Sequence, residues 1–120
     1  MAVISFSKKP EEIWHVAGWA FRQVLDDVVS QFPEDKEMAN KFEEAKTCYS
    51  GLLVEMLEPD FAARVVGALR QVLTRILSGA IRSGIHDHPY GDGKTVEQYH
   101  QALRQLLQIL SQRADSDLAE

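Results

Sequence analysis

With 120 residues, the chain has the usual size of one domain and can bury a core without a disulfide or a structural metal. A composition of 45% hydrophobic and 26% charged residues excludes a disordered chain and a membrane-spanning one. The formal net charge of −5 argues against nucleic acid as a partner, because binding to phosphates usually requires a basic excess. We therefore predict a single helical domain over residues 1–120, with no cofactor.

The chain start, MAVISFSKKPEE, lacks the basic and then apolar order of a signal peptide. The uncharged runs are also shorter than the roughly 20 apolar residues that a membrane-spanning helix requires. We expect a cytoplasmic protein with no membrane partner. The lone Cys48 excludes an intramolecular disulfide.

The first long periodic segment predicts a helix over residues 10–32, preceded by a short N-terminal arm over residues 1–8. Within this arm, AVISF at residues 2–6 is the one segment whose alternation would also fit a strand. Pro10 suits a first helical turn, and acidic residues follow it near the positive end of the helix dipole. Apolar residues then recur at the three-and-four spacing of one helical face: Ile13, Trp14, Ala17, Phe21, Val24, Leu25, Val28, Val29 and Phe32.

Two further helices are predicted over residues 34–57 and 59–83, each opened by a proline and early carboxylates. The apolar face of the segment 34–57 is expected to include Leu53 and Met56. Gly84 is expected to end the segment 59–83 as a left-handed cap, with Ile85 folding back on the last turn.

A fourth helix is predicted over residues 96–112, where Thr95 and Gln98 form a capping box, and a frayed tail follows over residues 112–120. Short connections between long amphipathic helices favour antiparallel neighbours. The predicted fold is all-α, an antiparallel up-down-up-down four-helix bundle.

A basic stripe is the first candidate binding surface. Arg64, Arg75 and Arg82 are eleven and seven residues apart, which at about 100° per residue places them within about 20° on one side of the helix 59–83. Gln71 and small neighbours would let a partner approach this side. Trp19 stands five residues after Trp14, so both cannot face the core, and an exposed Trp19 would suit a binding anchor. The alternative is that the arginines pair with carboxylates of the same chain.

The polar segment between the third and fourth predicted helices is the second candidate. His86, His88 and Asp92 could ligate zinc, nickel or copper, while Lys94 could help to hold an anion such as phosphate. The alternative is a long turn built by its proline and glycines.

These features favour a non-enzymatic protein-interaction module of the inhibitor, immunity or adaptor type. No nucleophile and base pair or cofactor fingerprint is visible, so an enzyme is less favoured. The partner is expected to be another protein, and a homodimer stays open. The alternative function is a small metal-binding or anion-binding protein or enzyme that uses the segment 85–94.

Overall fold

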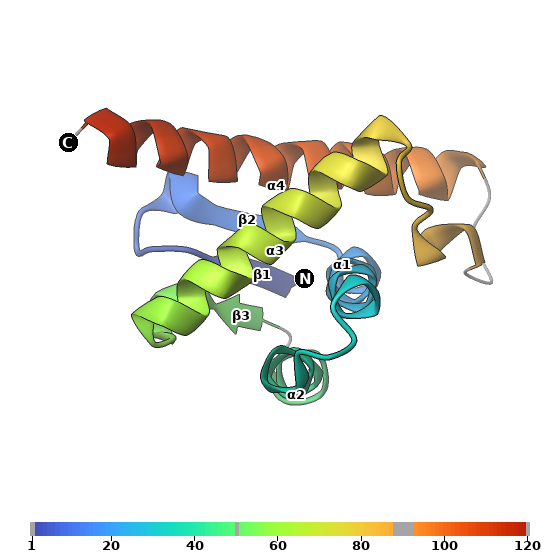
Figure 1. The fold of residues 1–120 in the computed structure, drawn as a ribbon. Helices are drawn as coiled ribbons and strands as arrows, with labels where there is room; N and C mark the ends of the chain where they lie inside the picture. Colours follow the sequence, from blue (N-terminus) through green and yellow to red (C-terminus); the bar gives the residue numbers. More distant parts are fainter. Residues whose placement is uncertain (1, 50, 88–92, 120) are drawn as a thin grey trace.

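The computed structural model describes residues 2–49, 51–87 and 93–119, and the side chains of these residues except 48, 49 and 113–119. Its elements follow one another along the chain as shown in Figure 1: β1 (Ala2–Ser5), the 3-10 turn η1 (Pro10–Glu12), β2 (Ile13–Val16), α1 (Gly18–Gln31), α2 (Lys36–Glu44), the π-helical turn η2 (Ala45–Tyr49), β3 (Gly51–Leu53), the 3-10 turn η3 (Val54–Met56), α3 (Pro59–Ser78), the 3-10 turn η4 (Gly84–Asp87) and α4 (Gly93–Ala119).

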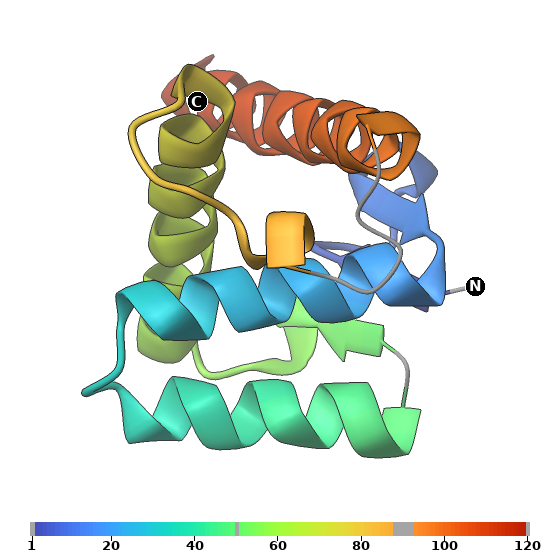
Figure 2. The same cartoon turned by 90° about the vertical axis from the view of Figure 1, so that its right-hand side faces the viewer.

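The prediction of an all-α up-down-up-down bundle is wrong, because the three strands form one mixed sheet in the order β2-β1-β3. The central strand β1 is antiparallel to β2 and parallel to β3. Residues 2–5 of the expected N-terminal arm are thus the middle of the sheet. The four α-helices lie around this sheet, and α1 and α2 run side by side in Figure 2.

The predicted helix 10–32 is divided between two kinds of structure. Pro10 does stand at the start of a helical turn, but that turn is a 3-10 turn of three residues. The next residues alternate between buried Trp14, exposed His15 and buried Val16, which is the period of a strand. A short run of aromatic and β-branched residues fits both periods, and pairing with β1 decides between them. The α-helix begins only at Gly18.

The predicted helix 34–57 also ends early, because residues 51–53 pair with β1 as the strand β3. Asp35 caps α2 by accepting a hydrogen bond from the Met38 N–H at 3.1 Å. The helix loosens into a π-helical turn after Glu44, and Gly51–Leu53 then pairs with Val3, Ile4 and Ser5. Leu53 and Met56 therefore lie outside any helix that could bury them.

The other two helices differ from the prediction at their ends. α3 stops at Ser78, where Gly79 adopts a left-handed conformation with φ 82°, five residues before the predicted cap at Gly84. α4 begins at Gly93 and continues to Ala119, so the helix extends through the segment that was expected to be frayed.

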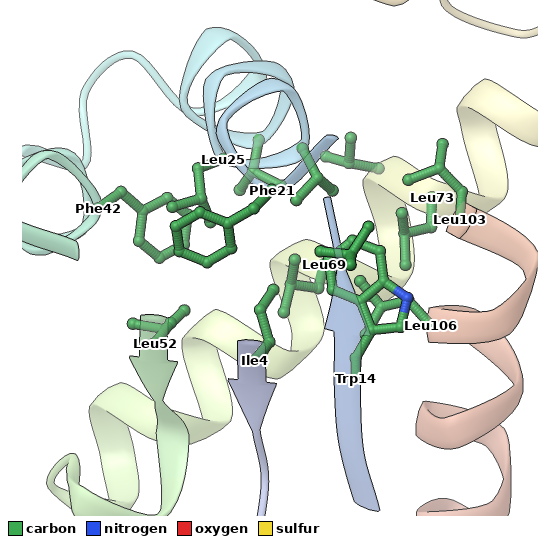
Figure 3. Close-up of a cluster of buried hydrophobic side chains, with 14 of the residues drawn as sticks. Ile4, Trp14, Phe21, Leu25, Phe42, Leu52, Leu69, Leu73, Leu103 and Leu106 are labelled. Carbon is green, nitrogen blue, oxygen red and sulfur yellow. The ribbon is translucent and has the colours of Figure 1, made fainter. Parts of the chain in front are cut away.

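The core lies between one face of the sheet and the helices. Ile4 is directly opposite both Trp14 and Leu52 in the register of the strands, so these three side chains form a row on one face. Figure 3 shows this row directed toward the buried side chains of the four helices: Phe21, Leu25, Phe42, Leu69, Leu73, Leu103 and Leu106. The indole N–H of Trp14 donates to the Ala102 carbonyl at 3.1 Å, which joins β2 to α4.

Candidate functional site

The cations of the predicted basic stripe are paired within the chain. Arg64 Nη2 lies 2.8 Å from Glu37 Oε1 and 3.2 Å from Asp35 Oδ1, so Arg64 joins α3 to the start of α2. Its guanidinium also lies over the Phe61 ring, 5.0 Å from the centroid. Arg64 is therefore already paired with two carboxylates of the same chain.

Arg75 and Arg82 have partners of their own. With the Gln71 amide oriented so that its oxygen faces Arg75, this oxygen accepts from both terminal guanidinium nitrogens at 2.7 and 3.2 Å. Arg82 lies beyond the end of α3, so it does not continue the helical face of Arg64 and Arg75. Its Nη1 donates to both carboxylate oxygens of Asp87, at 2.9 and 3.0 Å.

Trp19 is half-buried at the start of α1. Its ring lies 6.3 Å from the Tyr99 ring and is tilted by 42° relative to it. This contact joins α1 to α4, and it leaves only part of the indole for a partner.

The second predicted site is described only in part, since His88 and Asp92 lie outside the described residues. His86 and Lys94 are both exposed, on η4 and at the start of α4. His86 borders a cavity of about 430 Å³ that His100, Arg82 and Ser83 also line. Burial, and then the nearby Arg104 and His86, lower the pKa of His100. Among the described residues, no group of three or more His, Cys, Asp and Glu side chains could hold a metal ion.

The buried carboxylate of Asp27 is the centre of a polar cluster that none of the sequence motifs predicts. It accepts four hydrogen bonds, from α1, η4, α4 and the residue that precedes η4. The donors are Ser83 Oγ (2.5 Å), Tyr99 Oη (2.6 Å), Gly84 N (2.9 Å) and Gln23 Nε2 (3.0 Å). Burial, and then the charge of Asp27, raise the pKa of the Tyr99 phenol well above its usual range, so this hydroxyl stays a donor.

The Asp27 cluster fastens η4 to α1 and α4, and Figure 2 shows η4 lying against α1. All its donors come from the chain itself, and none of the described side chains has a buried polar atom without a partner. We therefore assign the cluster a structural role. Its signal in the sequence is an acidic residue three positions after Val24 and next to Val28, on the buried side of a helix.

The most accessible apolar side chains lie at the end of β3 and in the η3 turn that comes after it. Of the large hydrophobic side chains that the structure describes, Met56 and Leu53 are the exposed ones, at 75% and 48%. Met56 borders a groove of about 420 Å³ between α2 and the start of α3. We call this groove and Met56 the Met56 surface; its lining residues are Glu37, Asn40, Lys41, Glu44, Met56, Leu57, Glu58 and Phe61.

The apolar periodicity of the sequence conceals this surface, because it places Leu53 and Met56 on the buried face of a predicted helix. In the structure, the helix that this periodicity predicts ends at the π-helical turn η2. Gly51 was the local signal against a continuous helix, since glycine in a helix interior costs roughly 1 kcal/mol relative to alanine.

Comparisons with family models, curated proteins and solved structures found no match to this chain. In the part of the chain that the structure describes, no helix is both long enough and apolar enough to cross a membrane. Any assignment of function therefore depends on the surfaces described above.

Proposed function

We propose that this chain is a protein-interaction module that binds a partner protein through the Met56 surface. The supporting observation is the 75% exposure of Met56, whose side chain borders a groove instead of packing into the core. Methionine is enriched at protein interfaces and adapts its shape to different partners. Half-buried Leu57 and Phe61 extend the apolar character of the groove.

The location on the fold supports the same proposal. The η3 turn that carries Met56 follows β3 directly, and β3 is held in the sheet by its pairing with β1. Arg64 ties the start of α2 to α3 across the groove. The sheet pairing thus fixes the η3 side of the groove before a partner binds, which reduces the ordering cost of association.

The experiment that tests this proposal is site-specific photo-crosslinking in the source cell. A photoreactive amino acid placed at Met56 is expected to capture a partner as a discrete adduct. The matched control carries the same amino acid at Gln105, which is exposed on α4, and is expected to give no such adduct. Equal capture from both positions, or none from Met56, would contradict the proposal.

A single substitution gives a second measurement. Met56→Asp places a charge in the groove, and its effect on the free energy of unfolding should stay within about 0.5 kcal/mol because the side chain is exposed. The captured protein should no longer co-purify with this folded variant.

A further inference from the structure

The net charge of the chain is concentrated in the segment that forms the Met56 surface. Residues 34–60 contain eight carboxylates and three lysines, which gives this segment a formal charge of −5. The whole chain also has a charge of −5, so the other 93 residues balance to zero. The acidic character of the protein is therefore a local property of the segment 34–60.

Some of these carboxylates already have cationic partners. Lys41 lies 3.6 Å from Glu44, Lys46 lies 2.6 Å from Asp26 and 3.1 Å from Glu43, and Arg64 pairs with Asp35 and Glu37. These pairs are partly or largely exposed, so they are weak enough to rearrange when a partner binds.

Of the four carboxylates of this segment for which the described residues show no ion pair, three flank Met56 in the sequence. Glu55, Glu58 and Asp60 are exposed, and within the described residues none of them forms an ion pair. Glu58 occupies the N-cap position of α3 without making a side-chain capping hydrogen bond, so its carboxylate is available to another molecule. An exposed apolar side chain is thus flanked by negative charge that the fold does not neutralise.

Resting on the proposed function above, we infer that the partner of the Met56 surface presents a basic segment in which lysine or arginine residues flank an apolar side chain. The apolar side chain packs against Met56, Leu57 and Phe61 in the groove. The flanking cations face Glu58 and Glu44, and complementary charge fixes the register of the segment and speeds its association. A second copy of this acidic surface would be repelled.

The test is a selection of random twelve-residue peptides displayed on phage against the full-length protein. Enriched peptides are expected to combine an apolar residue with two or more lysines or arginines, and to perturb NMR signals of Met56 and Phe61. Their affinity should fall by tenfold or more between about 50 and 500 mM salt, because exposed ion pairs are screened as the Debye length shortens.

Matched charge reversals isolate the local effect from the global charge. Glu58→Lys and Glu97→Lys change the net charge equally, and both positions are exposed near the start of a helix. Glu58→Lys should weaken peptide binding about fivefold or more, in line with the loss and reversal of an exposed ion pair, while Glu97→Lys should change it less than about twofold.

The outcomes separate this inference from the proposed function. The inference would be overturned if peptides without a basic excess bound at Met56, or if the two charge reversals had equal effects on binding. In either case the proposed function, a protein-interaction module, would still stand. Peptides that bind only at another face, or no enriched peptide, would overturn both.

Discussion

Asp27 is a single residue on which the junction of α1, η4 and α4 depends. Its neighbour Asp26 is exposed and pairs with Lys46, so two adjacent carboxylates have opposite environments. A buried carboxylate that accepts several hydrogen bonds leaves all of its donors unsatisfied when it is removed. The difference between the two positions can be measured directly.

We expect Asp27→Ala to lower the free energy of unfolding by about 3 kcal/mol, because Ser83, Gly84 and Tyr99 lose their shared acceptor. Asp26→Ala should cost less than about 1 kcal/mol, as is typical of an exposed ion pair. Urea denaturation of the two variants gives both values. Similar losses would show that the Asp27 cluster adds no more stability than the exposed ion pair of Asp26.

His100 makes a separate prediction about pH. Its pKa is lowered in the folded protein by burial, by Arg104 and by His86, whereas the unfolded chain should titrate near about 6.5. As the pH falls below about 6.5, the unfolded chain binds a proton that the folded protein resists, so the free energy of unfolding decreases. The stability contributed by neutral His100 is present above this pH and is lost below it.

His100→Gln should therefore reduce the loss of stability between about pH 7.5 and pH 5.5. Urea denaturation of wild type and variant at these two values tests the prediction. An unchanged pH dependence would mean that His100 does not titrate differently in the two states.

At the scale of elements, the end of α3 depends on the backbone conformation of one glycine. The Gly79 N–H donates to the Ile76 carbonyl at 3.1 Å, and the Ala80 N–H donates to the Arg75 carbonyl at 2.8 Å. These bonds satisfy carbonyls that would otherwise be free at the helix end. Gly84, the predicted cap, is a site where space and not helix capping favours glycine. A Cβ there would lie 2.8 Å from Gln23 Nε2.

Two alanine substitutions, one within α3 and one directly after it, should change the free energy of unfolding in opposite directions. Gly79→Ala is expected to lower the free energy of unfolding by about 1 kcal/mol, because φ is 82° at this position. Gly67→Ala, in the exposed middle of α3 with no atom within 4 Å of the added Cβ, should raise it by about 0.5–1 kcal/mol. Thermal and urea denaturation measure both effects, and a stabilising Gly79→Ala would contradict the assigned cap.

At the scale of the whole molecule, the sequence predicts local structure more reliably than long-range pairing. The approximate positions of α3 and α4 follow from their apolar periodicity and from Pro59. The sheet could not be found in this way, because four residues at the chain start pair with segments whose periodicity also fits a helix. The same error hid Met56, whose exposure depends on where α2 ends.

The central position of β1 determines the order in which the sheet can form. β1 and β2 are close in sequence, and a hairpin of this kind forms within about 1–10 µs. The other edge of β1 stays unpaired until β3 forms, because Val3 pairs with Gly51, forty-eight residues later in the chain. During synthesis and refolding, this open edge can accept the β3 segment of another chain, so slow refolding at high concentration should yield strand-exchanged oligomers.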